Sequence, residues 1–556
     1  MTDFVLDIRD LRLEVEGAAE GAKPIVQNIN LTVRPGEVHA LIGESGSGKT
    51  TIALSALGHI RPGLVRTSGE VLLNGTDLFS LPPNELRDVR GNRVSYVAQS
   101  AAASFNPSLR IGDQVTEPTR EHQIMAQSQA RADALDLYKE LRIPTPENIS
   151  RRFPHEVSGG QLQRLMAAMA MISKPDLIIF DEPTTALDVT TQVSVLMAFR
   201  ALIKQHRTAA LYVTHDLAVV SQIADRVTVL LNGEVQEQNT MSNLIDTPQH
   251  EYSRILMQAG TPADSFDQAD TSARATKAPI LDVRNITAGY GPIGRDGRPL
   301  APVLQDVSLS LERGQVLGVI GESGSGKSTM AKAISGLLPT ALGEVRLEGT
   351  VLPARVEDRP KDLVRRIQIV SQSADTALNP SHSIEKILGR PVDYFMGLKG
   401  EAKRARVAEL LRMVSLPESL ADRRPSELSG GQKQRINLAR ALAAEPNVIL
   451  CDEVTSALDS IVRNSIVELI GELRERLNVA IVFISHDVST VSKIADTVAV
   501  MNMGRIVEAG PTGKVLTAPE HAYTRLLMNS VPKVEIGWLE GAYQSIMREQ
   551  AALNQA

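Results

Sequence analysis

Short apolar runs recur along the chain, and each ends at residues of potential chemical use. In the first half, HALI precedes Gly43, LIIF precedes Asp181 and LYVT precedes His215. In the second half, LGVI, VIL and IVFI stand in the matching places. Uninterrupted short runs that are rich in Val and Ile predict strands of a parallel sheet that is covered on both faces.

Between these runs, the apolar residues change to helical spacing, with intervals of three and four residues. One such helix is predicted to stop near Pro144 and another near Pro417, because proline commonly follows a helix end. Their apolar positions are Ala134, Leu137, Tyr138 and Leu141 in the first half and Val407, Leu410, Leu411 and Val414 in the second. The pattern predicts an α/β core with a helical segment inserted before the SGGQ sequence of each half.

The chain is an internal repeat of two long units. GESGSGKT at 43–50 returns as GESGSGKS at 321–328, and VSGGQ at 157–161 returns as LSGGQ at 428–432. FDEPTTALD at 180–188 and THD at 214–216 return as CDEVTSALD at 451–459 and SHD at 485–487. The offset of 271–278 residues is far longer than the period of a solenoid, so it predicts two homologous domains.

A polar segment separates the two copies. Residues 259–278 read AGTPADSFDQADTSARATKA, which has the small and polar composition of a linker. The sequence therefore predicts a first domain over 1–258, a linker over 259–278 and a second domain over 279–556.

Composition narrows the classes of protein to which this chain can belong. Of its 556 residues, 43% are hydrophobic and 22% charged, which excludes wholesale disorder. The net charge of −6 argues against a general binder of polyanions. A single cysteine excludes a disulfide framework and a cysteine-bound zinc or iron–sulfur cluster. The acidic start predicts no signal peptide, and the lack of apolar runs of about 18 residues predicts no membrane span.

The first repeated motif, G-x-x-x-x-G-K-[ST], predicts a phosphate-binding loop at Gly43–Thr50 and again at Gly321–Ser328. Its glycines let consecutive backbone N–H groups surround a phosphate, and the helix that follows adds its positive N-terminus. Lys49 and Lys327 are predicted to reach the β- and γ-phosphates, and Thr50 and Ser328 to bind Mg²⁺.

An acidic pair follows a predicted strand in each half, as Asp181–Glu182 and Asp452–Glu453. The carboxyl ends of parallel strands face the ligand crevice, so the aspartate can hold Mg²⁺ and the glutamate can polarise an attacking water. SGGQ, at Ser158–Gln161 and Ser429–Gln432, opens a predicted helix and offers a second anion-binding cup. Two cups per domain suggest that two domains grip one nucleotide. For one isolated copy, a glycine-assisted helix start is the simpler interpretation.

Phosphate loop, glutamine, SGGQ, acidic pair, ALD and histidine, in this order, resemble the ATPase domain of ABC proteins, twice and over essentially the whole chain. The resemblance implies an α/β fold of two tandem P-loop ABC-type ATPase domains. Each would have a RecA-like parallel-sheet core, an inserted α-helical subdomain and an antiparallel β subdomain. ATP and Mg²⁺ are the implied ligands, without an iron–sulfur cluster.

The resemblance also assigns roles to individual residues. It identifies a general base in each glutamate, a γ-phosphate contact in each histidine, a Q-loop glutamine and a D-loop aspartate. The implied catalytic residues are Glu182, His215, Glu453 and His486, and the implied metal ligands are Thr50, Gln99, Asp181, Ser328, Gln372 and Asp452. The implied nucleotide-binding residues are Gly43, Ser45, Gly46, Ser47, Gly48, Lys49, Thr50, Thr51, Gln99, Ser158, Gly159, Gly160, Gln161, Asp188, Tyr290, Gly321, Ser323, Gly324, Ser325, Gly326, Lys327, Ser328, Thr329, Gln372, Ser429, Gly430, Gly431, Gln432 and Asp459.

Family geometry implies that the two domains pair head to tail. The loop at Lys49 would then hold ATP against Ser429–Gln432, and the loop at Lys327 against Ser158–Gln161. Tyr290 resembles the aromatic residue that stacks on adenine, whereas Val15 stands in its place in the first half. We therefore expect unequal nucleotide affinity at the two sites, unless another ring such as Phe4 substitutes or phosphate contacts dominate.

Further blocks resemble ATPases of the peptide/opine/nickel import subfamily, including its fused members. These blocks are SFNPS at 104–108, ALNPS at 377–381, PQHEYSRIL at 248–256 and PEHAYTRLL at 519–527. The resemblance implies an ATP-hydrolysing motor subunit of a bacterial importer at the cytoplasmic face of the inner membrane. Its implied partners are two transmembrane permease subunits and a substrate-binding protein, without nucleic acid. Peptide, glutathione, opine and nickel chelate all stay open as the solute.

Two other functions compete with this one. One is a soluble tandem ABC ATPase that acts on ribosomes or nucleic acid. Ribosome-acting members of the family usually have a long, charged helical linker between their domains. Here the linker is short and holds only two basic residues, Arg274 and Lys277, which disfavours this function. The other is an exporter ATPase. It is disfavoured because exporters often carry a membrane span in the same chain, and this sequence predicts none.

Overall fold

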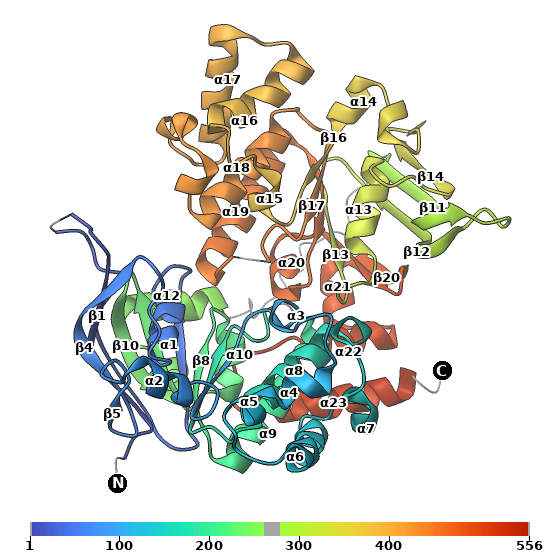
Figure 1. Cartoon of the computed structure of the whole chain (residues 1–556). Helices are drawn as coiled ribbons and strands as arrows, with labels where there is room; N and C mark the ends of the chain where they lie inside the picture. Colours follow the sequence, from blue (N-terminus) through green and yellow to red (C-terminus); the bar gives the residue numbers. More distant parts are fainter. Residues whose placement is uncertain (1–2, 20, 186, 261–277, 457, 554–556) are drawn as a thin grey trace. The chain divides into compact units, whose positions relative to one another are not determined.

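The computed structural model describes the chain except for residues 1–2, 20, 186, 261–277, 457 and 554–556 (Figure 1). It divides into two compact units, of which the first comprises Met1–Pro262 and Pro532–Ser545 and the second Ala263–Val531 and Ile546–Ala556. Within the predicted linker, Ala259 and Gly260 complete a helix, and 261–277 lie outside the described residues.

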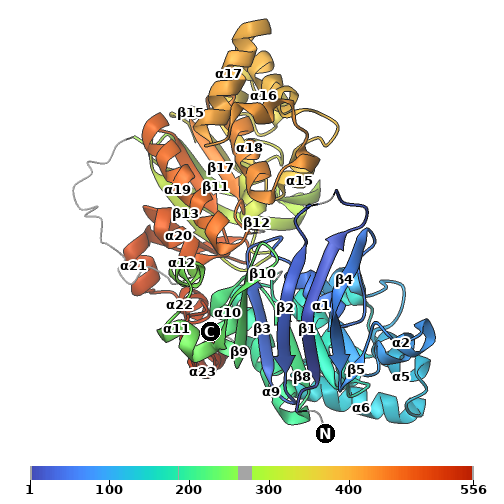
Figure 2. The same ribbon diagram turned by 90° about the vertical axis from the view of Figure 1, so that its left-hand side faces the viewer.

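The first unit contains a six-stranded sheet with the order β10-β9-β3-β8-β7-β6, in which only β10 runs antiparallel. A four-stranded antiparallel sheet has the order β2-β1-β4-β5 (Figure 2). The strands are β1 (Leu6–Val15), β2 (Val26–Val33), β3 (Val38–Gly43), β4 (Leu64–Leu73), β5 (Thr76–Asp77), β6 (Val94–Val97), β7 (Leu177–Asp181), β8 (Ala209–Val213), β9 (Arg226–Leu231) and β10 (Glu234–Thr240). Strands β3, β7 and β8 are the three predicted from the sequence, and every residue in them is buried.

The second unit repeats this topology, with the sheets β16-β17-β18-β13-β19-β20 and β12-β11-β14-β15. Its strands are β11 (Leu281–Ile293), β12 (Pro299–Leu311), β13 (Val316–Ile320), β14 (Leu342–Leu347), β15 (Thr350–Val351), β16 (Ile367–Val370), β17 (Val448–Asp452), β18 (Ala480–Ile484), β19 (Thr497–Asn502) and β20 (Arg505–Pro511). The predicted fold class, a parallel-sheet core with an antiparallel β subdomain in each half, is confirmed. Cys451 is fully buried in β17, as expected for a small apolar residue.

The helices of the first unit are α1 (Lys49–Ser55), α2 (Pro83–Val89), α3 (Ala101–Ser104), α4 (Ile111–Val115), α5 (Glu117–Glu121), α6 (Gln127–Glu140), α7 (Pro146–Ile149), α8 (Gly159–Met171), α9 (Val189–His206), α10 (Leu217–Ile223), α11 (Met241–Asp246) and α12 (Glu251–Gly260). Those of the second are α13 (Lys327–Ser335), α14 (Lys361–Arg366), α15 (Ala374–Ala377), α16 (Ile384–Pro391), α17 (Gly400–Met413), α18 (Gly430–Leu442), α19 (Ser460–Leu477), α20 (Val488–Ile494), α21 (Thr512–Thr517) and α22 (Ala522–Asn529). A last helix, α23, spans Trp538–Leu553.

The predicted inserted helices are α6 and α17, and they end at Glu140 and Met413, shortly before Pro144 and Pro417. All eight apolar positions predicted for them are buried. Along the chain, each of them stands with shorter helices after the edge strand of the parallel sheet, β6 or β16, and before the helix that SGGQ opens, α8 or α18. The predicted α-helical insert is therefore confirmed.

The core of each unit fixes the position of the phosphate loop. In the first unit, apolar residues of the antiparallel sheet, of α1 and of one face of the parallel sheet form a single buried cluster. Ile52 and Ala53 anchor α1 in this cluster, and both are fully buried. Met330 and Ala331 anchor α13 in the second unit in the same way. Because apolar burial holds each helix on both sides, the loop that precedes it starts from a rigid base.

A segment near the C-terminus belongs to the first unit. The side-chain amide of Gln222 donates to the carbonyl oxygens of Lys533 (2.7 Å) and Glu535 (2.9 Å) and accepts from the backbone N–H of Leu539 (3.1 Å). Leu539 is fully buried, and Arg200 pairs with Glu540 at 2.7 Å. The sequence-based boundary assigned this segment to the second domain, so the chain returns to its first half after completing its second.

Candidate functional site

The phosphate loop of the first unit connects β3 to α1. A Cβ at Gly43 would collide with the carbonyl oxygen of Leu230 on the neighbouring strand, and Gly48 has a positive φ of 97°. Lys49 is 6% exposed, and its Nζ donates to the carbonyl oxygens of Gly43 (2.8 Å) and Glu44 (2.7 Å). The hydroxyl of Ser47 is buried and has no hydrogen-bond partner among the described residues. A buried ammonium beside an unsatisfied hydroxyl fits a phosphate group.

The second phosphate loop, between β13 and α13, has the same geometry. Lys327 Nζ donates to the carbonyl oxygens of Gly321 and Glu322, both at 2.8 Å. Ser325 has a buried hydroxyl that likewise finds no partner in the described part of the chain. The backbone N–H of Glu322 donates to the hydroxyl of Tyr523 at 2.9 Å. Tyr523 comes from the PEHAY tail on α22, so the tail directly supports this loop.

A hydroxyl and a carboxylate meet behind each loop. Thr50 Oγ1 donates to Asp181 Oδ1 at 3.1 Å, and Ser328 Oγ donates to Asp452 Oδ1 at 2.8 Å. Burial raises the pKa of both aspartates above the ordinary value, because a desolvated carboxylate loses the water that stabilises its charge. Hard oxygen ligands with a buried negative charge are what Mg²⁺ prefers, so these residues fit a magnesium ion.

Glu182 lies at the centre of the first site. His215 Nδ1 is 3.0 Å from Oε1 of Glu182, and the Gln99 amide donates to Oε2 at 3.1 Å. Burial alone would raise the pKa of Glu182, but the hydrogen bond and charge of His215, with the charge of Lys49, hold it below its ordinary value. Glu182 has a positive φ of 48°, a strained conformation that is typical of functional sites.

Glu453 repeats this arrangement in the second site with looser contact to its histidine. Gln372 donates to Glu453 Oε2 at 2.9 Å, whereas His486 Nδ1 lies 3.5 Å from the same oxygen. The φ of Glu453 is 49°. Burial opposes ionisation here too, and His486 and Lys327 keep the pKa of Glu453 below its ordinary value. The structure thus brings glutamine, glutamate and histidine together in each half.

Tyr96 is a site residue that the sequence analysis missed. It lies on β6, three residues before Gln99, and its hydroxyl donates to Asp181 Oδ2 at 2.7 Å. Ile369 occupies the corresponding place on β16, so Asp452 has no equivalent tyrosine. The sequence gives no comparable signal for Tyr96, because the matching position of the second half is Ile369 and the repeat comparison therefore does not mark it.

Each SGGQ sequence begins a helix as a capping box. Ser158 Oγ accepts from the backbone N–H of Gln161 at 3.3 Å, and the Gln161 side chain accepts from the N–H of Ser158 at 3.0 Å. Ser429 and Gln432 make the same two bonds at the start of α18. The helix-start interpretation is therefore correct locally, and both serines remain exposed.

The D-loop aspartates also cap helices. Asp188 Oδ1 accepts from the backbone N–H of Thr191 at 2.9 Å, at the start of α9. Asp459 Oδ1 accepts from the N–H of Val462 at 3.0 Å, at the start of α19. Both aspartates precede the helix that packs against the one opened by SGGQ.

Tyr290 and Val15 occupy corresponding positions on β11 and β1. They are 49% and 45% exposed, so both present their side chains at the surface. Phe4 lies below the guanidinium of Arg34, 5.6 Å from the ring centroid, which commits one face of that ring.

Comparison with known proteins places the chain in a family. The model of the ABC transporter family matches residues 26–185 and 304–456, and that of the oligopeptide/dipeptide transporter C-terminal region matches 507–555. A peptidoglycan transport ATP-binding protein of Agrobacterium fabrum is 36% identical over 541 residues, covering 96% of this chain and 97% of that protein. A glutathione import ATP-binding protein of Escherichia coli is 37% identical over 545 residues, covering 92% and 87%.

Among solved structures, a dimeric bacterial ABC transporter cassette is 26% identical, covers 42% of this chain and 98% of its own, and gives a TM-score of 0.37. The match to two ABC transporter ATPase domains defines an ATPase, and the chain belongs to the ABC transporter family. More particularly, it is a fused two-domain ATPase of the peptide-importer group, which confirms the resemblance found in the sequence. No helix in the described part of the chain is both long and apolar enough to cross a membrane.

The two glycines of each SGGQ sequence give a matched test. A Cβ at Gly160 would collide with the methyl group of Thr191 on α9, whereas at Gly159 it would meet nothing within 4 Å. We expect Gly160→Ala to lower the free energy of unfolding by about 1–3 kcal/mol, because the contact between α8 and α9 is overpacked.

Gly159→Ala is the control and should leave the melting temperature unchanged. The second unit repeats the pair, since a Cβ at Gly431 meets Val462 and one at Gly430 meets nothing. Thermal unfolding of the four variants checks the prediction, and equal melting temperatures within each pair would contradict it.

Proposed function

We propose that this ATPase is the motor subunit of a bacterial importer of a peptide-like solute, and that it works with two transmembrane permease subunits and a substrate-binding protein. Its place would be the cytoplasmic face of the inner membrane. The observation that carries the proposal is the duplicated site, since each half brings a buried lysine and a glutamate bonded to glutamine. The oligopeptide/dipeptide transporter region at 507–555 supports the peptide-like solute.

The two halves would bind two ATP molecules head to tail. The Lys49 loop would hold one nucleotide against Ser429–Gln432, and the Lys327 loop the other against Ser158–Gln161. The open space beside Gly159 and Gly430 at the helix starts supports this pairing, because a phosphate can approach backbone N–H groups there. ATP binding would close the two domains, and hydrolysis with product release would reopen them.

The residues of each site have separable chemical roles. Lys49 would leave its loop carbonyls and neutralise the transferring phosphoryl group. Thr50 and Asp181 would hold Mg²⁺, which when bound neutralises phosphate charge. Glu182, kept ionised by His215 and Lys49, would accept a proton from the attacking water. Lys327, Ser328, Asp452, Glu453 and His486 would act in the same way in the second site.

Uptake by single lysine variants tests this function. We expect Lys49→Ala and Lys327→Ala each to reduce ATP-driven uptake of a labelled peptide by roughly 10²-fold or more, because each removes a preorganised charge from the transition state. Cells carrying the chain with its own permease genes provide the measurement. Lys204→Ala, an exposed lysine on α9, is the control. Full uptake in either site variant would overturn the two-site proposal.

Unequal adenine contact is a second expected property. We propose that Tyr290 stacks on the base at the second phosphate loop, while Val15 offers no ring at the first. Stacking on an aromatic ring is worth roughly 1–3 kcal/mol, so Tyr290→Ala should weaken ATP binding there by about 5- to 150-fold. Val15→Tyr should strengthen binding at the first loop.

Site-resolved ATP titrations, carried out in Lys49→Ala and Lys327→Ala backgrounds, separate the two affinities. Tyr290→Phe keeps the ring and is the matched control. Equal affinities that respond to neither substitution would refute the stacking role and leave the catalytic proposal intact.

A further inference from the structure

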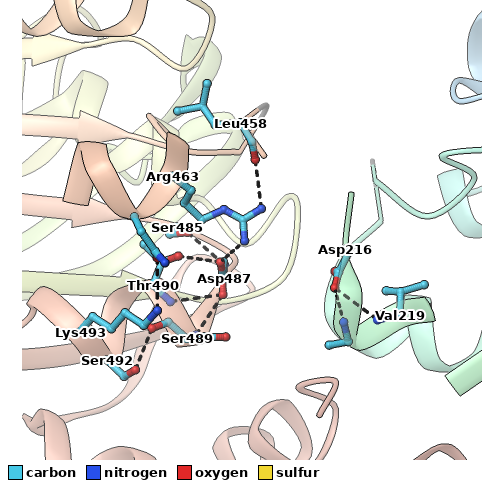
Figure 3. Close-up of polar contacts among 12 residues, drawn as sticks. Asp216, Val219, Leu458, Arg463, Ser485, Asp487, Ser489, Thr490, Ser492 and Lys493 are labelled. Carbon is cyan, nitrogen blue, oxygen red and sulfur yellow. Dashed lines mark hydrogen bonds and ion pairs between the residues drawn. The ribbon is translucent and has the colours of Figure 1, made fainter. Parts of the chain in front are cut away.

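The segment that follows His486 in the second unit is held by four bonds to one carboxylate, that of Asp487. Asp487 caps α20, and its Oδ1 accepts from the backbone N–H groups of Ser489 (3.0 Å) and Thr490 (3.3 Å). Its Oδ2 accepts from the Thr490 hydroxyl (2.6 Å) and from Arg463 Nη1 (3.1 Å). Figure 3 draws these contacts, which converge on a single carboxylate next to His486.

Arg463 connects this carboxylate to a second loop. It lies in the first turn of α19, and its Nη2 donates to the carbonyl oxygen of Leu458 at 3.1 Å, one residue before the D-loop Asp459 (Figure 3). The planar guanidinium therefore spans the D-loop and the histidine segment with two separate N–H groups. Such a fork is rigid, and its bonds to a carboxylate are among the stronger ones in proteins.

The charge of Asp487 is well supported. Burial alone would raise the pKa of Asp487, but the Arg463 charge, with the hydrogen bonds from Thr490 and Ser489, holds it below the ordinary value. Arg463 and Asp487 are each 23% exposed, so water screens the pair only in part.

Among the residues of the first unit that the structure describes, no side chain makes this connection. Gln192 stands at the position of Arg463, and its amide donates to Thr184 Oγ1 at 3.4 Å. Asp216 keeps its capping bonds to the N–H groups of Ala218 (3.0 Å) and Val219 (3.2 Å), and Val219 replaces Thr490. Figure 3 accordingly draws Asp216 with capping bonds alone.

The two histidines are thus held differently. His215 contacts Glu182 directly at 3.0 Å, whereas His486 lies 3.5 Å from Glu453. We propose that Arg463 is a positioning residue of the second site, which ties Leu458 to Asp487 and thereby fixes His486 relative to Glu453. This inference rests on the roles proposed above for Glu453 and His486. Through these two bonds, Arg463 makes the D-loop and the histidine segment of the second unit move together, whereas those of the first unit move separately.

Steady-state ATP hydrolysis by the full chain tests the inference through three variants: Arg463→Gln, His486→Ala and the double variant. His486→Ala defines the part of kcat that depends on this histidine. Arg463→Gln, which installs the residue found at position 192, should reduce that part about tenfold. The KM for ATP should change less than about twofold, because Arg463 does not line the phosphate loop. The double variant should match His486→Ala, since the arginine acts through the histidine.

Conservative and control variants separate positioning from stability. Arg463→Lys should recover part of the activity, because one ammonium can pair with Asp487 but cannot also hold Leu458. Arg476→Gln, an exposed arginine on the same helix, should retain wild-type kcat. Melting temperatures should fall by no more than about 4 °C, since partly exposed ion pairs contribute little to stability.

The outcomes are distinct. Wild-type kcat in Arg463→Gln with a loss in His486→Ala would overturn the inference and leave the proposed function standing. Additive losses in the double variant would overturn it too, because the arginine would then act elsewhere. Wild-type kcat in His486→Ala would refute the role proposed for the histidine itself.

Discussion

Two adjacent carboxylates at the end of one buried strand are the constraint around which each site is built. Asp181 and Glu182 lie where β7 leaves the sheet, and Asp452 and Glu453 do so on β17. Desolvation works against both negative charges, and their proximity adds repulsion. The surrounding groups stabilise the aspartate and the glutamate in different ways. Hydroxyl groups donate hydrogen bonds to each aspartate, whereas a histidine, a lysine charge and a glutamine amide stabilise the negative charge of each glutamate. Each glutamate also has a positive φ, of 48° and 49°, which is a backbone conformation that recurs at functional sites.

The duplicated fold tolerates different chemistry at matching positions. Tyr96 supports the first aspartate where the second half has Ile369, and Arg463 braces the second histidine segment where the first half has Gln192. An ion pair formed by the inserted helix, α6 or α17, has opposite charges in the two units. Asp133 pairs with Lys174 at 3.1 Å in the first unit, and Arg406 pairs with Glu445 at 3.0 Å in the second. The first two exchanges change the contacts of site residues and the third keeps its ion pair with the charges reversed, so the two sites need not be equal in rate.

Sequence reasoning located the motifs because phosphate loops, acidic strand ends and helix caps are local patterns. The strands before Gly43, Asp181 and His215 followed from uninterrupted apolar runs, and the helices through Tyr138 and Leu410 followed from helical spacing. Contacts between distant segments could not be found in this way. Tyr523 reaches Glu322 from 201 residues away, and Gln222 bonds to Leu539 from 317 residues away. No local pattern encodes those meetings, because they depend on how the completed sheet places its loops.

If each half contributes its own glutamate to ATP hydrolysis, replacing both glutamates should trap ATP on the chain, and nucleotide retention measures this. In Glu182→Gln/Glu453→Gln, the amide preserves size but cannot accept the proton, so hydrolysis should fall by roughly 10²- to 10⁴-fold. The phosphate loops remain intact in that variant. Two ATP molecules per chain should therefore stay bound after free nucleotide is removed by rapid gel filtration, whereas the wild-type chain releases ADP. Wild-type turnover by the double variant, or rapid loss of its nucleotide, would contradict the account.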